Sequence, residues 1–160
     1  MLKKPQLTLF VLIFIMVSQL FPVNSALSQD SWWKNKKYRT ETKRQKFAEC
    51  KKVFVDIADG INYSNVYMVT PYFGSEVYLN FVETQKGYYS PDQAQFIVDN
   101  FFNNYPAYSF KWRVSNASEN YAFALGKHKY KKNGYANKFD VSVSLKYSNN
   151  KWLIDQIIVN

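Results

Sequence analysis

Two carboxylates are the residues of this chain best placed for acid–base chemistry, Asp140 and Asp155. In strand alternation Asp155 shares a face with Leu153, Ile157 and Val159. A carboxylate desolvated on such a face has a raised pKa, which general acid–base catalysis requires. Asp140 falls on the polar side of its segment. Asp155 is therefore the candidate catalytic residue; the alternatives are pairing with a lysine or a position at a sheet edge.

Three further side chains are candidates for lining a ligand pocket beside Asp155. They are Gln156, Trp112 and Tyr147. Gln156 could instead accept a hydrogen bond beside the sheet. These residues define the hypothesis of a small-molecule carrier or an isomerase- or dehydratase-like enzyme.

Metal and cofactor sites are not expected. One histidine and one cysteine cannot supply a zinc set, and no glycine-rich phosphate loop or Ser/His/Asp set is readable. His128 lies between two lysines near a turn and is expected to be a surface residue. Cys50 is spaced from Phe47 and Phe54 as a buried thiol, with no partner for a disulfide within the chain.

The positive charge is concentrated in one segment. The formal net charge is +9, and nine Lys/Arg residues lie between positions 34 and 52, opposed by two glutamates. After position 52 the chain is almost neutral. Trp32 and Trp33 directly precede this segment. Together they could contact an anionic membrane or polysaccharide surface, or the segment could be a solvated linker. The candidate contact residues are Lys34, Lys36, Lys37 and Arg39.

The first 28 residues have the order of a secretory signal peptide. Two lysines precede an apolar run at residues 7–21, and small residues follow. Cleavage is expected after Ser28, with Ser25 and retention as an anchor as alternatives. The only cysteine lies well inside the chain, so a lipoprotein is not expected. A periplasmic or secreted location follows, which argues against nucleic acid as a partner.

Helical periodicity is present in three segments, at residues 42–62, 64–73 and 90–105. Thr42 and Gln45 are spaced as a capping box at the start of the first segment. Its apolar residues recur at three and four positions on one face: Phe47, Cys50, Phe54, Ile57 and Ile61.

The third helix has the best start signal in the chain, Ser90-Pro91-Asp92-Gln93. Ser90 is the expected cap, Pro91 suits the first helical position and Gln93 closes the box.

Strand alternation is expected at residues 76–83 and again after Pro106. Tyr108, Phe110, Trp112 and Val114 share one face of the next strand. Strands also follow from about 121 to 131, from 139 to 147 and from 152 to 159, with an Asn133-Gly134 hairpin turn. The last strand is apolar on both faces, so a helix on one side and a second subunit on the other are expected to cover it.

The order helix, helix, strand, helix and four strands predicts an α+β domain with a curved antiparallel sheet packed on about three helices. We assign residues 1–28 to the signal peptide, 29–42 to a basic aromatic linker and 43–160 to one domain. The chain resembles the nuclear transport factor 2-like (NTF2-like) fold, a cone-shaped sheet wrapped around helices. It is similar to the exported bacterial family named domain of unknown function 4783. The residues that carry the resemblance are Gly87 to Ala94, Phe101-Phe102, Tyr121 to Gly126 and Trp152 to Ile157.

The resemblance implies no functional residues, because the family has no assigned activity and the fold hosts both enzymes and binding modules. We expect a non-enzymatic binding or assembly module, and a homodimer through the open sheet face. The ligand carrier or enzyme, and envelope attachment through the basic segment, are the alternatives.

Overall fold

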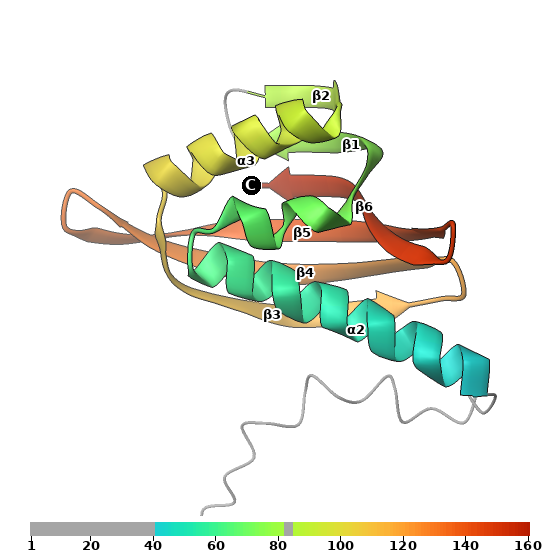
Figure 1. The fold of residues 1–160 in the computed structure, drawn as a ribbon. Coiled ribbons are helices and arrows are strands. Elements are labelled where there is room, and N and C mark those ends of the chain that lie inside the picture. Colours follow the sequence, from blue (N-terminus) through green and yellow to red (C-terminus); the bar gives the residue numbers. More distant parts are fainter. Residues whose placement is uncertain (1–40, 82–84) are drawn as a thin grey trace, which may run out of the picture.

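The computed structural model describes residues 41–81 and 85–160. Two helices lie on one face of a six-stranded sheet (Figure 1). The helices are α2 (Glu41–Asn62) and α3 (Pro91–Asn104). Two 3-10 turns, η2 (Val66–Met68) and η3 (Thr70–Tyr72), follow α2 in the chain and lead into the first strand. The strands are β1 (Phe73–Phe81), β2 (Gln85–Tyr89), β3 (Ala107–Ala117), β4 (Tyr121–Lys132), β5 (Tyr135–Ser148) and β6 (Lys151–Val159).

Helix α2 confirms the expected apolar face. Phe47, Cys50, Phe54, Ile57 and Ile61 are all buried against the sheet. Thr42 is already helical, so it is not the cap that its spacing from Gln45 predicted. No helix in the described ranges is both long and apolar enough to span a bilayer.

The expected second short helix is present as two consecutive 3-10 helices and not as an α-helix. Ser64 has a φ of 50°, which interrupts the helical backbone conformation just after α2. Pro71 has no N–H to donate to an α-helical hydrogen bond. The short segment therefore forms i to i+3 bonds, while Val66 and Val69 still face inward and are buried.

Helix α3 begins as predicted. The Ser90 hydroxyl accepts from the Gln93 N–H, and the Gln93 side chain accepts from the Ser90 N–H, which completes the capping box. Ala94, Val98 and Phe102 are buried beneath the helix.

The sheet has the strand order β2-β1-β6-β5-β4-β3. All neighbours are antiparallel except β1 and β6, which are parallel. Strand β2 was not expected, because it is a five-residue edge strand without apolar alternation. The turns at Asn133-Gly134 and Asn149-Asn150 have positive φ at both residues, which matches the right-handed twist of the hairpins they join.

The first half of strand β4 places its small residues inside and its large residues outside. Ala122, Ala124 and Gly126 are buried, whereas Phe123 and Leu125 are exposed. A Cβ at Gly126 would lie 2.4 Å from the Phe110 ring, so only glycine fits beneath that ring. Small residues here make room for the aromatic residues of β3 and for α2.

Strand β3 contains register shifts that its alternation did not predict. The pairing with β4 shifts between Trp112 and Val114. One extra residue in β3 therefore reverses the sheet face on which the following side chains lie. Phe110 is buried as expected, but Val114 and Tyr108 face outward, with 53% and 52% of their surfaces exposed. The expectation of one continuous apolar face was therefore wrong.

Strand β6 contains a second shift, and it explains why the strand reads as apolar on both faces. Ser144 is opposite Gln156, but Leu145 is opposite Ile154, so Asp155 is the extra residue of a bulge. The bulge brings both halves of the strand onto the inner face: Trp152, Ile154, Ile157 and Val159 are all buried there. Most of the strand's apolar surface is thus covered within the chain itself.

Candidate functional site

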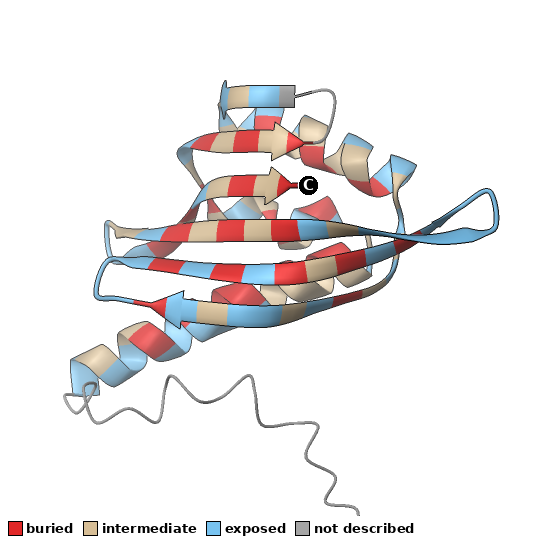
Figure 2. Ribbon diagram, turned by 180° about the vertical axis from the view of Figure 1, so that it is seen from behind, coloured by how far each residue is buried: buried red, intermediate tan, exposed pale blue. Residues whose placement is uncertain are grey.

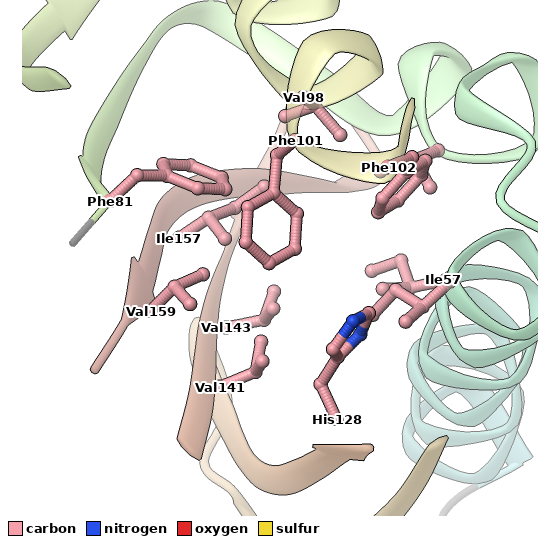
Figure 3. A pocket seen from close by; sticks show the side chains of 12 residues that line it. Ile57, Phe81, Val98, Phe101, Phe102, His128, Val141, Val143, Ile157 and Val159 are labelled. Carbon is pink, nitrogen blue, oxygen red and sulfur yellow. The ribbon is translucent and has the colours of Figure 1, made fainter. Parts of the chain in front are cut away.

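The inner face of the sheet packs on the helices, and a small cavity lies among the core side chains (Figure 3). The cavity has a volume of about 20 Å³, which is room for one water molecule. Twelve side chains line it; eleven are apolar, and the twelfth is His128. Phe81, Phe101 and Phe102 supply aromatic walls from β1 and α3.

His128 of β4 is fully buried, which corrects the expectation of a surface histidine. Even positions of β4 face the core, so His128 follows Ala124 and Gly126 inward while the adjacent lysines face away. The Nε2 atom lies 2.8 Å from the Tyr105 carbonyl oxygen. Burial lowers the pKa of the ring, although this hydrogen bond opposes the shift. The ring is therefore neutral at pH 7.

The Nδ1 atom of His128 has no hydrogen-bond partner within the described residues. A carbonyl oxygen can only accept, so the hydrogen of the neutral ring is on Nε2 and Nδ1 has a free lone pair. A buried acceptor left unsatisfied costs about 1–3 kcal/mol. The alternation of β4 was the sequence signal that could have located this group in the core.

The carboxylates predicted for catalysis lie away from this cavity. Asp155 is exposed at the β6 bulge, separated from the buried Ile157 and Val159, so the expected shared face does not form. Asp140 is exposed on the outer face and pairs with the Lys127 ammonium at 2.5 Å, which lowers the pKa of the Asp140 carboxyl. Among the described residues, no aspartate or glutamate lines the cavity.

The three candidate ligand-binding residues are not brought together. Gln156 is half-buried on the outer face, opposite Ser144. Trp112 packs edge-on against Phe54 and donates from Nε1 to the Phe54 carbonyl at 2.8 Å. Tyr147 packs on Trp152 beneath the Lys46 ammonium, 3.6 Å from the Tyr147 ring centroid, at the other end of the sheet.

Cys50 is buried as predicted, and burial raises the pKa of its thiol to about 12. A thiol with so high a pKa stays protonated and unreactive at neutral pH. Within residues 41–81 and 85–160, no three His, Cys, Asp or Glu side chains are grouped as metal ligands.

The basic residues at positions 34, 36, 37 and 39 lie outside the described residues, as does the whole signal segment. The described part of the basic segment lies on α2 and is engaged with the domain. Lys43 pairs with Glu119 at 2.5 Å, and Lys52 pairs with Asp56 at 2.5 Å.

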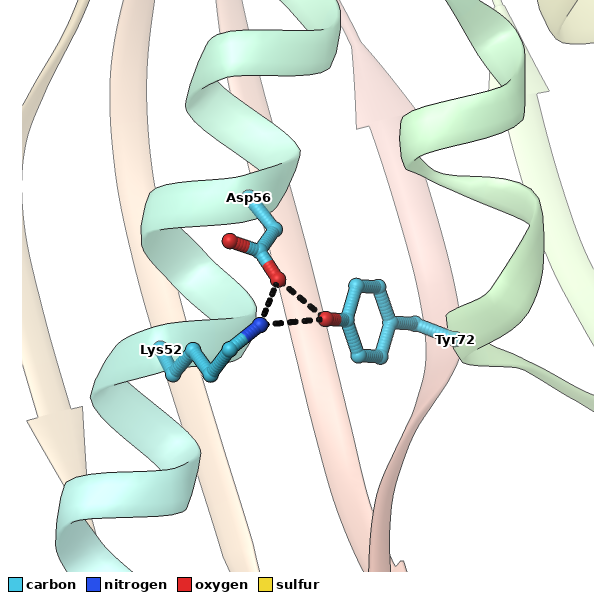
Figure 4. Close-up of polar contacts among 3 residues, drawn as sticks. All are labelled: Lys52, Asp56 and Tyr72. Carbon is cyan, nitrogen blue, oxygen red and sulfur yellow. Dashed lines mark hydrogen bonds and ion pairs between the residues drawn. The ribbon is translucent and has the colours of Figure 1, made fainter.

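Lys52, Asp56 and Tyr72 form a polar cluster that connects α2 to η3 (Figure 4). The Tyr72 hydroxyl donates to Asp56, and the Lys52 ammonium lies within 3.4 Å of the same hydroxyl oxygen. Burial alone would raise the pKa of Asp56, but the hydrogen bonds from Lys52 and Tyr72 outweigh it and lower that pKa. The cluster satisfies its own polar groups, so we assign it a structural role.

Figure 2 shows the outer face of the sheet, where exposed and buried positions alternate along the strands. Three apolar residues on this face are exposed and form the outer patch: Val114, Phe123 and Leu125. Val114 is opposite Leu125 across the β3–β4 pair, and Phe123 is two residues along β4. Their exposed fractions are 53%, 39% and 42%. A hollow of about 310 Å³ adjoins this outer patch, lined by residues that include Arg113, Asp140 and Ser142.

Comparison with solved structures defines the class of the fold. A ketosteroid isomerase-like protein from Erwinia carotovora atroseptica matches with a TM-score of 0.57 and 11% identity, over 72% of this chain and 95% of that one. An NTF2-like protein of unknown function from Shewanella oneidensis matches with a TM-score of 0.51 and 10% identity, over 71% and 97%. The α+β fold is NTF2-like, as expected.

A structure from Bacteroides uniformis, described as a DUF4783 family protein, has a TM-score of 0.61 and 19% identity, covering 66% of this chain and 94% of that chain. The model of the family named Domain of unknown function (DUF4783) matches residues 54–160. The chain belongs to this family, which confirms the resemblance seen in its sequence. No curated protein matches it.

Proposed function

We propose that this protein is an exported, non-enzymatic module that acts by assembly through the outer face of its sheet. The observation that carries the proposal is the outer patch of Val114, Phe123 and Leu125, which is exposed although the interior is filled. Contiguous apolar side chains on one sheet face are typical of interaction sites. The position of the two carboxylates away from the cavity gives the enzyme alternative no support.

A second copy of the chain is the partner that we propose for this face. Val114 and Leu125 belong both to the outer patch and to the lining of the hollow at Ser142, so one copy offers exposed apolar side chains and a recess side by side. Its margin carries both signs of charge, with Arg113 positive and Asp140 negative. A two-fold interface pairs such a patch with itself without placing only like charges together.

Light scattering at micromolar concentration tests the proposal on protein expressed from the full-length coding sequence. We expect a dimer, and a shift to monomer in Leu125→Lys because a buried unpaired charge opposes association. Tyr67→Lys is the matched control: Tyr67 is exposed on η2, on the helical side, and the variant should remain dimeric. A strictly monomeric wild type would overturn the assembly proposal.

A second candidate function is attachment to an anionic surface, and one feature of the structure favours it. The β4–β5 hairpin projects beyond the body of the domain (Figure 1), and every residue from 131 to 138 is exposed. This hairpin tip contains Lys131, Lys132 and Lys138 and no acidic residue, with Tyr135 76% exposed. Together with the predicted basic linker, it supplies cations for anionic head groups or polysaccharide.

A further inference from the structure

The cavity at His128 has a property that packing alone does not account for: among the described residues, one polar atom in an apolar lining has no partner. His128 is 0% exposed, its Nε2–H is used by the Tyr105 carbonyl, and Nδ1 is left as a bare acceptor. A ligand that satisfies this atom must present a hydrogen-bond donor.

The walls define the rest of that ligand. Ile57, Val98, Phe101 and Val159 are among the eleven apolar side chains around the cavity. Within residues 41–81 and 85–160 no charged side chain lines it, so an ionic ligand would lose its hydration without compensation from these walls. The fitting molecule is therefore neutral, with an apolar body.

A single water molecule satisfies the site poorly. Buried waters usually make about three hydrogen bonds, and apolar side chains form every wall of this cavity except His128. An amphipathic molecule needs only the one polar contact that the cavity offers.

Phe101 is the wall residue through which a larger body can enter. It is only half-buried, whereas Phe81 and Phe102 are buried, and its ring centroid lies 5.3 Å from that of His128 (Figure 3). Displacement of the Phe101 side chain would enlarge the cavity of about 20 Å³, at the cost of its ring contacts with Tyr105 and Phe139. One aromatic ring is the size of body that the displaced phenyl group leaves room for.

We propose that this cavity is a binding site for a small neutral molecule with an apolar, ring-sized body and one hydroxyl or N–H donor, which donates to Nδ1 of His128. Phenol is the simplest probe of this class, and toluene has nearly the same shape without the donor. The site is independent of the outer patch, so its test and the test of dimerisation can fail separately.

The experiment follows the ring nitrogens of His128 by NMR while phenol or toluene is added to protein expressed from the full-length coding sequence. We expect phenol to shift the Nδ1 signal saturably and toluene to leave it unchanged. Phe101→Ala should bind phenol about tenfold more tightly, because the side chain that must move is absent. Phe96→Ala is the matched control: this exposed phenylalanine lies on the same helix, and phenol affinity should not change.

Three results would overturn the proposal. The first is the absence of a saturable phenol shift in both wild type and Phe101→Ala. The second is an equal response to phenol and toluene. The third is an Nδ1 signal that reports a trapped water that phenol does not displace. His128→Phe should lose phenol binding; if that variant does not fold, the wild-type nitrogen spectrum decides alone.

Discussion

At the scale of one residue, Gly126 shows how successive residues of β4 alternate between the inner and the outer face of the sheet. Its missing side chain lets the Phe110 ring lie directly on the β4 backbone, while its neighbour Leu125 faces outward. The same alternation continues to His128, which brings a titratable ring into the core. Gly126 thus permits the close packing of the Phe110 ring, and His128 places a polar group in the interior.

Gly126→Ala should lower the free energy of unfolding by about 1–3 kcal/mol, because the new Cβ would lie 2.4 Å from the Phe110 ring. Gly87→Ala is the matched control in another strand, where the nearest atom is the Tyr89 hydroxyl at 3.6 Å. Denaturant unfolding measures both. Equal losses in the two variants would show that the close approach at Gly126 does not limit the packing.

The buried histidine should make stability depend on pH. The pKa of His128 is lower in the folded protein than its ordinary value of 6.5, so the unfolded chain binds the proton first. Stability is then fully present above pH 6.5 and falls as the pH drops from there toward the folded pKa.

Denaturant unfolding at pH 7 and pH 5 measures this dependence. His128→Phe should lose less stability than wild type over the same interval. The pKa values of Asp56 and Asp140 are lowered from 3.8, so these groups affect stability only at more acidic pH. Identical slopes in the two proteins would contradict a neutral, buried His128.

At the scale of elements, single extra residues decide which faces are apolar. The shift before Val114 turns that side chain onto the outer face, and the bulge at Asp155 turns Ile157 and Val159 inward. Because the side-chain period of a strand is two, one inserted residue reverses every position that follows. The shift in β3 therefore adds Val114 to the outer patch, and the bulge in β6 brings the apolar residues of that strand into the core.

The capping box of α3 is an element that can be tested directly. Ser90→Ala should lower the free energy of unfolding by about 1 kcal/mol, since the Gln93 N–H loses its acceptor. Ser75→Ala, at an exposed site in β1, should leave stability almost unchanged. Thermal unfolding compares the two, and the prediction fails if their midpoints coincide.

At the scale of the whole molecule, the domain presents two different surfaces to its surroundings. The outer face of the sheet carries the outer patch of Val114, Phe123 and Leu125, whereas the tip of the β4–β5 hairpin carries three lysines. The hairpin tip projects from the sheet and is exposed (Figure 2). The helical side covers the interior. Assembly and surface attachment can therefore occur on the same molecule, because the two functions use separate regions.

Partitioning onto anionic vesicles tests attachment. Deleting residues 30–40, which stops short of α2, should release the protein, and binding of the intact protein should weaken as salt is added. Replacing Lys131, Lys132 and Lys138 by glutamine tests the hairpin tip separately, at about 1 kcal/mol for each lysine near the surface. Binding that is indifferent to salt and to both changes would exclude this function.

The NTF2-like class followed from a family resemblance, whereas the patterns of the sequence itself determined the helix faces, the Ser90 cap, the hairpin turns and the buried Cys50. These depend on local periodicity and turn chemistry, which neighbouring residues specify. It did not reveal the β2 edge strand, the bulges or the burial of His128. Those depend on pairing between strands distant in sequence, and only the tertiary structure sets their register. The same holds for the candidate site. Asp155 was predicted from a strict alternation of inner and outer residues, which the β6 bulge interrupts. His128 is identified as a site residue only once the packing of β4 beneath α3 is known.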